Sequence, residues 1–210
     1  MNSLFTRIPK SLWLLLLILL VAAALAGWHF LGDKSEPAPR GNLEGSAVGG
    51  AFNLIDENGA PVTNDSFNGQ WRLMYFGFTW CPDICPTDSA KLAAALKQIE
   101  AENPALAAKI QPIFVSVDPA RDTPAALKEF TAQFHPRLLG LTGSEAQVAD
   151  ALKTFRIYAQ KQPGATPDSY LMDHSALFYL FDPDGRPVAF LSPMTAGPNE
   201  VAAMLKAHVR

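Results

Sequence analysis

A short apolar run that passes directly into a helical pattern constrains the fold of this chain more than any other feature. Residues 72–77 have the sequence Arg-Leu-Met-Tyr-Phe-Gly, typical of a buried strand, and apolar residues recur at helical spacing over residues 92–99. Cys81 and Cys85, the chain's two cysteines, lie between these segments. The order of strand, cysteine loop and helix predicts an α/β unit built around the cysteines.

The chain beyond about residue 48 repeats this alternation of strand-like and helix-like segments. The expected elements are a hairpin at 52–62, strands at 110–117, 138–141, 176–181 and 187–191, and helices at 124–134, 144–155 and 199–209. Thr123 and Pro124 begin one helix with a capping hydroxyl and a proline in the first turn. Such an alternation predicts an α/β fold with a central mixed sheet flanked by helices.

The N-terminal segment has a different character. Residues 11–31 are almost wholly apolar, and about 20 such residues form a helix of roughly 30 Å, which matches a bilayer core. Arg7 and Lys10 precede this run, so the positive-inside rule keeps the N-terminus in the cytoplasm and exports the rest. We therefore predict a single-pass transmembrane helix. A cleaved signal peptide is the alternative, because residues 24–26 are Ala-Leu-Ala before a glycine.

These segments divide the chain into four predicted parts. They are a short cytoplasmic N-terminus at 1–10, a transmembrane anchor at 11–31, a linker at 32–47 and one folded domain at 48–210. About ten residues before the anchor are too few for a typical mitochondrial transit peptide. The predicted location is therefore the bacterial inner membrane, with the folded domain in the periplasm.

The charge of the chain gives no reason to expect nucleic acid as a partner. The formal net charge is -3, and the sequence has no run of Lys or Arg that could follow a phosphate backbone. We therefore expect no interaction with nucleic acid.

The spacing of Cys81 and Cys85 leaves three kinds of chemistry open. A four-residue offset places both sulfurs on one side of a helical turn, so one bond or one ion can engage both. A structural disulfide would stabilise the fold little, because a loop of about five residues contributes only ~2 kcal/mol against ~4.7 for a hundred-residue loop. Thiols near a helix N-terminus have a lowered pKa and become thiolates available for exchange or for metal. A redox pair and a metal site are both favoured over a structural bridge.

A metal site would need a third ligand, and the four histidines are the candidates. His29 lies at the end of the predicted anchor, His135 at the end of a predicted helix and His208 near the C-terminus, and each position has an ordinary explanation. His174 precedes a predicted buried strand, where it either reaches a neighbouring loop or is a structural residue. Two Cys and one His would form a soft set suited to Cu(I) and able to take Cu(II), whereas a structural zinc site needs a fourth protein ligand.

Five motifs occur in a particular order in this chain. They are residues 77–86 (GFTWCPDICP), 116–124 (SVDPARDTP), 140–143 (GLTG), 170–175 (YLMDHS) and 181–185 (FDPDG). In this order the motifs resemble the Sco/SenC/PrrC family. The resemblance implies a thioredoxin-like domain on the outer side of a membrane, with copper held by Cys81, Cys85 and His174. It also implies a role in assembling the binuclear copper centre of cytochrome c oxidase subunit II, by delivering copper, by reducing that subunit's cysteines, or by both.

The favoured function is a copper metallochaperone, from which a partner's cysteines displace the copper ligands one at a time. The alternative is a membrane-tethered thiol-disulfide reductase with Cys81 and Cys85 as its redox-active pair, and a peroxiredoxin-like peroxidase is a third option. The expected partners are cytochrome c oxidase subunit II, other copper-donor chaperones and the membrane. We expect the chain to act as a monomer.

Three acidic residues have two possible roles each. Asp118 and Asp122 either lie beside the site, because ligands of α/β sheets gather at strand ends, or shape a turn and cap the next helix. Asp173 either orients His174 through its other ring nitrogen or has a turn or surface role. In each case the second role is favoured.

Three apolar or soft residues are also ambiguous. Met172 and Met194 could assist Cu(I) transfer, although core packing is the expected role of a methionine. Trp80 belongs either to an apolar docking surface or to a covered edge. Many members of the Sco/SenC/PrrC family have histidine at this position, so Trp80 removes a possible auxiliary ligand.

Overall fold

The structure is a computed structural model that describes residues 10–31, 41–164 and 169–210. The chain forms two compact units, Met1–Pro37 and Ala38–Arg210. In the first unit, helix α1 spans Lys10–Leu31. Among the described residues, no helix has the length and apolar character required to cross a membrane. The transmembrane anchor and the four-part division of the chain stay predictions.

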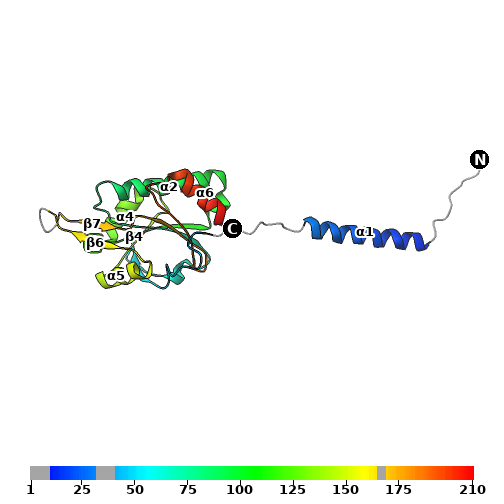
Figure 1. Cartoon of the computed structure of the whole chain (residues 1–210), viewed down its shortest axis with the longest axis horizontal. Coiled ribbons are helices and arrows are strands. Elements are labelled where there is room, and N and C mark those ends of the chain that lie inside the picture. Colours follow the sequence, from blue (N-terminus) through cyan, green and yellow to red (C-terminus); the bar gives the residue numbers. More distant parts are fainter. Residues whose placement is uncertain (1–9, 32–40, 165–168) are drawn as a thin grey trace, which may run out of the picture. The chain divides into compact units, whose positions relative to one another are not determined.

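The second unit is a mixed sheet covered by helices (Figure 1). Its strands are β1 (Asn53–Asp56), β2 (Pro61–Thr63), β3 (Trp71–Gly77), β4 (Ile110–Ser116), β5 (Leu139–Thr142), β6 (Ala159–Gln162), β7 (Leu171–His174), β8 (Phe178–Phe181) and β9 (Pro187–Leu191). Its helices are the short 3-10 helix η1 (Asn64–Phe67), α2 (Ile84–Glu102), α3 (Pro104–Ala107), α4 (Pro124–Ala132), α5 (Glu145–Thr154) and α6 (Pro198–His208).

Seven of these strands form one sheet in the order β2-β1-β5-β4-β3-β8-β9, and β6 pairs with β7 in a separate two-stranded sheet. Strand β4 runs parallel to both β3 and β5, whereas the remaining neighbours are antiparallel. The predicted α/β class with a central mixed sheet is therefore confirmed. Figure 1 shows α2 and α6 side by side on one face of the sheet and α5 on the other.

Strand β3 lies between β4 and β8 in the sheet, and all of its residues are buried. Arg72 is the polar residue among them, and its Nη1 donates a hydrogen bond of 2.7 Å to Asn64 Oδ1. Strands β3 and β4 end together, with Gly77 opposite Ser116. The two loops that follow these strands, which carry Cys81 and Asp118, therefore begin at the same edge of the sheet.

Gly77 allows the cysteine loop to pack closely against the end of β3. A Cβ atom at this position would lie 3.0 Å from the sulfur of Cys85 and 2.9 Å from the ring of Tyr75. Both distances are shorter than ordinary van der Waals contact, so a larger residue would displace one of these side chains. The glycine at the end of the strand is therefore part of how the fold positions Cys85.

The predicted helix starts agree well with the structure. The hydroxyl of Thr123 accepts a hydrogen bond from Ala126 N (3.2 Å) at the start of α4, and Ser144 caps α5 through Gln147 N (3.3 Å). These are the capping interactions expected of hydroxyl side chains at helix N-termini. Asp118 and Asp122 do not cap α4, so the capping role that was favoured for them is wrong.

Two segments differ from the sequence prediction. The hairpin of β6 and β7 was not predicted, and it places His174 on a strand rather than in a loop. Residues 41–43 contact β9, where Leu43 N donates to Val188 O (3.0 Å). Chain contacts with the domain therefore begin before residue 48, the predicted start of the domain.

Candidate metal centre

The sulfur of Cys81 lies at the N-terminus of α2. Cys81 is half-buried in the loop after β3, and Cys85 is buried in the first turn of the helix. The backbone N–H of Cys85 donates a hydrogen bond to the Cys81 sulfur over 3.3 Å. Asp83, the residue that precedes the helix, makes no capping hydrogen bond with its side chain. The Cys81 sulfur therefore accepts from a helix N–H group that would otherwise lack a partner.

The pKa values of the two thiols are shifted in opposite directions. The pKa of Cys81 is lowered to about 5, mainly by the hydrogen bond from the Cys85 side chain. Burial raises this pKa, whereas hydrogen bonds from backbone N–H groups lower it further. The hydrogen bond to Cys81, followed by burial, raises the pKa of Cys85. In the metal-free protein near neutral pH, Cys81 is therefore a thiolate and Cys85 is a thiol that donates to it.

His174 contacts Cys85 directly. Its Nε2 atom lies 3.4 Å from the Cys85 sulfur, and its Nδ1 atom lies 3.3 Å from the carbonyl oxygen of Ser175. A carbonyl oxygen can only accept, so this contact assigns the ring proton to Nδ1 and leaves the lone pair of Nε2 for a metal ion. The rings of Tyr75 and Phe78 meet the imidazole edge to face, at centroid distances of 6.3 and 5.9 Å.

Cys85 contacts both of the other candidate ligands, Cys81 and His174. Within the described ranges, no three His, Cys, Asp or Glu side chains are arranged as a ready metal cluster. The donor chemistry nevertheless fits a soft ion, because the three side chains supply two sulfurs and one imidazole nitrogen. Binding one ion here requires Cys85 to lose its proton and the three donor atoms to converge.

Comparison with known proteins supports the family predicted from the motifs. The family model described as SCO1/SenC matches residues 40–210. The chain belongs to the SCO1/SenC family. This result confirms the resemblance that the five motifs indicated.

Relatives of this SCO1/SenC protein occur in mitochondria and in bacteria. The mouse (Mus musculus) protein "SCO2 homolog, mitochondrial" is 45% identical over 177 residues, which cover 81% of this chain and 69% of that protein. The copper-bound structure of Bradyrhizobium japonicum ScoI is 44% identical with a TM-score of 0.69, and the match covers 76% of this chain and 98% of that one. BsSco, described as having a disulfide switch and as a member of the Sco family of cytochrome c oxidase assembly proteins, is 27% identical with a TM-score of 0.58 over 83% of this chain and 96% of that one.

In this SCO1/SenC chain, Asp122 ties the cysteine loop to the end of β4. Its buried carboxylate accepts from the hydroxyl of Thr79 (2.7 Å), from Thr79 N (3.2 Å) and from the hydroxyl of Ser116 (2.6 Å). Burial is the main cause that raises the pKa of Asp122, and these hydrogen bonds oppose the shift. Asp122 therefore lies beside the site and fixes the loop that carries Cys81.

Asp118 connects the loop after β4 to the hairpin that carries His174. Its carboxylate accepts from the hydroxyl of Tyr170 (2.7 Å) and from Arg121 Nε (2.6 Å). Arg121 Nη1 also donates to the carbonyl oxygen of Tyr170 (3.0 Å), and its guanidinium lies 3.6 Å from the Tyr170 ring centroid. Asp118 also shapes the turn, because its carbonyl oxygen accepts from Asp122 N (2.9 Å).

The structure also distinguishes the two roles considered for Asp173, Met172, Met194 and Trp80. Asp173 is exposed and accepts from Gln162 Nε2 (2.8 Å), so the favoured surface role is correct and the carbonyl of Ser175 orients His174 instead. Met172 is half-buried against the core, as expected. Met194 is 91% exposed, and the core role predicted for it is wrong. Trp80 is 62% exposed, which excludes a covered edge.

A buried polar network behind Cys85 was not predicted. The hydroxyl of Tyr75 donates to Asp88 Oδ2 (3.0 Å), and Lys91 Nζ lies 3.2 Å from Asp88 Oδ1. Burial, followed by the negative charge of an ionised Cys85, raises the pKa of Tyr75. A signal for this network exists in the sequence, because Asp88 lies three residues after Cys85 and four before Leu92, on the apolar face of α2.

Proposed function

We propose that this chain is a copper metallochaperone that binds copper through Cys81, Cys85 and His174. The contact of 3.4 Å between the Cys85 sulfur and His174 Nε2, one helical turn from the Cys81 sulfur, carries this proposal. Membership of the SCO1/SenC family, in which the Bradyrhizobium japonicum protein has a copper-bound structure, supports copper as the ion. Two thiolates and one imidazole also match the ligand softness of Cu(I) and can accommodate Cu(II).

The recipient that we propose is cytochrome c oxidase subunit II, at its binuclear copper centre. The description of BsSco as a member of a family of cytochrome c oxidase assembly proteins supports this choice. Cys81 is half-buried, so a partner's thiol can reach it without unfolding the domain. Exchange of soft ligands at an accessible sulfur allows copper to leave in steps rather than by full dissociation.

Copper titration of the full chain tests the proposal. We expect one copper per chain in the wild type and none after Cys81→Ser and Cys85→Ser are combined, and an unchanged stoichiometry in the double variant would contradict the proposal. X-ray absorption should show sulfur and nitrogen neighbours in the wild type and loss of the nitrogen in His174→Ala. His208→Ala is the matched control, because His208 lies near the end of α6 and should leave the copper neighbours unchanged.

A thiol-disulfide reductase is the second candidate, and the acidity of Cys81 favours it. A thiolate with a pKa of about 5 next to a second thiol is the arrangement of a dithiol that attacks a partner's disulfide. The disulfide switch described for BsSco also supports this candidate. In a disulfide reduction assay, a reductase should lose activity in either cysteine variant but keep it in His174→Ala. A copper chaperone should lose copper transfer in all three variants.

We also propose that residues 11–31 anchor the chain in the bacterial inner membrane with the folded domain in the periplasm. This proposal rests on the apolar composition of that segment and on the basic residues before it. Carbonate extraction of membranes should leave the full chain in the pellet. External protease added to spheroplasts should digest the folded domain, and protection from the protease would contradict the proposed orientation.

A further inference from the structure

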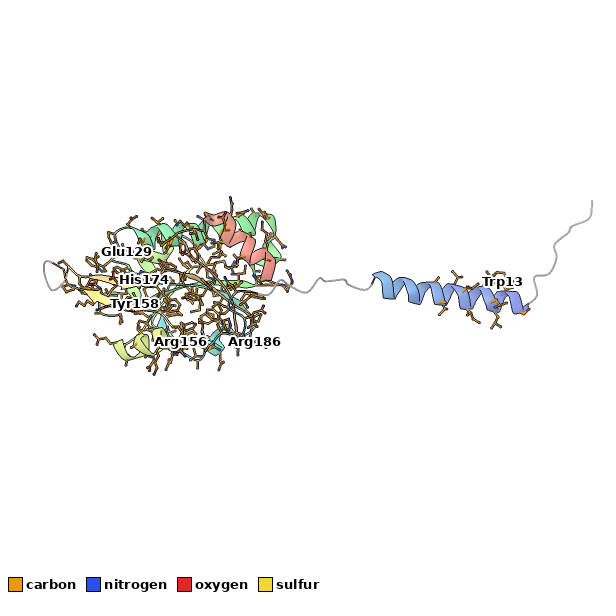
Figure 2. All side chains as sticks on the ribbon, in the orientation of Figure 1. Trp13, Glu129, Arg156, Tyr158, His174 and Arg186 are labelled. Atoms are coloured by element: carbon orange, nitrogen blue, oxygen red, sulfur yellow. The ribbon has the colours of Figure 1, made fainter. Side chains whose placement is uncertain are left out.

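A cavity of about 380 Å³ opens between the cysteine loop and α4. Trp80 and Cys81 line one side of it. Ala126 and Glu129 from α4 and Gln133, the residue that follows α4, line the other. Figure 2 shows Glu129 at the same end of the domain as His174. The cavity is large enough for a few amino-acid side chains, so it can receive a short stretch of polypeptide beside a reactive sulfur.

Cys81 is the proposed copper ligand that faces this cavity. Cys85 and His174 do not line it, and Cys85 is fully buried beneath the loop with His174 as its neighbour. A group that enters the cavity therefore meets the sulfur of Cys81 before it can reach the other two side chains. This arrangement gives the three proposed ligands an order of accessibility.

Glu129 is the carboxylate that lines the cavity. In the part of the chain that the structure describes, the carboxylate of Glu129 makes no hydrogen bond or ion pair. The guanidinium of Arg121, 5.5 Å from the Trp80 ring, is paired with Asp118. A carboxylate without an ion pair favours a cationic occupant.

We propose that this cavity receives the segment of the partner polypeptide that contains its copper-binding cysteine, with a basic residue of that segment paired to Glu129. This inference rests on the proposed copper-transfer function. The partner's thiol loses its proton and its sulfur forms a bond to Cu(I) as the bond between copper and Cys81 breaks. This proton passes to the released sulfur of Cys81, and copper stays in the Cu(I) state. Cys81 is the first ligand replaced, and Cys85 and His174 follow.

Small disulfides of different charge test the charge preference directly at Cys81. The test uses the metal-free Cys85→Ser variant. The sulfur of Cys81 attacks one sulfur of the probe and forms a mixed disulfide with it. The S–S bond of the probe breaks, and the other half of the probe leaves as a thiolate. Cationic cystamine should react faster than neutral bis(2-hydroxyethyl) disulfide. Adding Glu129→Gln should lower this ratio by about fivefold, the effect of one charge pair of ~1 kcal/mol in water.

Asp150→Asn is the matched control, because it removes an exposed carboxylate from α5, outside the cavity. The measured quantity is the rate with cystamine divided by the rate with bis(2-hydroxyethyl) disulfide. If Glu129→Gln changes this ratio no more than Asp150→Asn does, the charge preference is overturned. The assay uses no copper, so its failure would leave the copper titration untouched. Failure of the copper titration would instead remove the proposed function on which the inference rests.

Copper transfer tests the entry route. Wild-type protein loaded with Cu(I) should pass copper faster to a Cys-x-x-x-Cys peptide flanked by Lys than to one flanked by Glu, and Glu129→Lys should invert this preference. Ala126→Phe should fill the cavity and slow transfer to both peptides by about tenfold while the copper stoichiometry stays at the wild-type value. Unchanged preference in Glu129→Lys would overturn the proposal even where Ala126→Phe fails to fold.

Discussion

The Nε2 atom of His174 lies 3.4 Å from the sulfur of Cys85, although 89 positions separate the two residues in the chain. Cys85 is in the first turn of α2. His174 is the last residue of β7, in the two-stranded sheet that β7 forms with β6. The carbonyl of Ser175 and the rings of Tyr75 and Phe78 hold the imidazole in this orientation. The site therefore depends on two elements that are positioned independently, and each can be perturbed separately.

Removal of His174 should weaken Cu(II) more than Cu(I). Imidazole nitrogen is a better ligand for Cu(II), whereas the two thiolates suffice for Cu(I). We expect His174→Ala to lower Cu(II) affinity by more than about tenfold. Loss of a residue that only supports a metal ligand already lowers metal affinity by about 10–100-fold, and His174 is proposed as a ligand itself. Competition titrations with a chelator for each oxidation state measure the two affinities. Equal losses for both states would contradict the role given to His174.

Alkylation of Cys81 in the metal-free protein should depend on the side chain at position 85. With a pKa of about 5, Cys81 in the wild type should react with iodoacetamide at a nearly constant rate at neutral pH and more slowly as pH falls through that value. Cys85→Ala removes the main cause of the shift, so the profile should move toward the ordinary thiol pKa of about 8.5. Cys85→Ser keeps a hydrogen-bond donor and should move the profile less.

Loss of the Asp122 carboxylate should loosen the cysteine loop. Asp122→Ala leaves the backbone N–H and the hydroxyl of Thr79 and the hydroxyl of Ser116 without their acceptor. Leaving one buried polar group unsatisfied costs about 1–3 kcal/mol, and we expect a loss of about 3 kcal/mol in the free energy of unfolding. Urea denaturation measures this loss. Asp150→Asn is the exposed control, and an equal effect in both variants would contradict the proposed role of Asp122.

Loss of the Tyr170 hydroxyl should loosen the hairpin that carries His174. Tyr170→Phe removes the hydrogen bond to Asp118 (2.7 Å) but keeps the ring that contacts Arg121. We expect a loss of about 1 kcal/mol in stability and faster amide exchange over β7. Hydrogen-exchange mass spectrometry of residues 171–174 measures the second effect. Tyr158→Phe is the matched control, because Tyr158 is exposed and contacts Gln160 rather than Asp118.

The fold could be predicted from the sequence where local pattern and burial agree. The apolar run of β3, the hydroxyl caps Thr123 and Ser144 and the hairpin of β1 and β2 each have signals within a few residues. The hairpin of β6 and β7 has no comparable signal, because β6 is Ala-Gln-Lys-Gln and is largely exposed. Its position depends on Tyr170 and Arg121, whose contacts join segments far apart in the chain.

The sequence by itself determined the predicted donor set of the candidate site, because two cysteines four residues apart and a histidine in a motif of the Sco/SenC/PrrC family supply soft ligands. Tertiary structure alone decided which residues assist that set. It placed Asp122 beside the cysteine loop, made the Ser175 carbonyl the partner of His174, and left Met194 in solvent. Local sequence carries the identity of a donor atom, whereas the partner of that atom depends on distances between elements that only packing fixes.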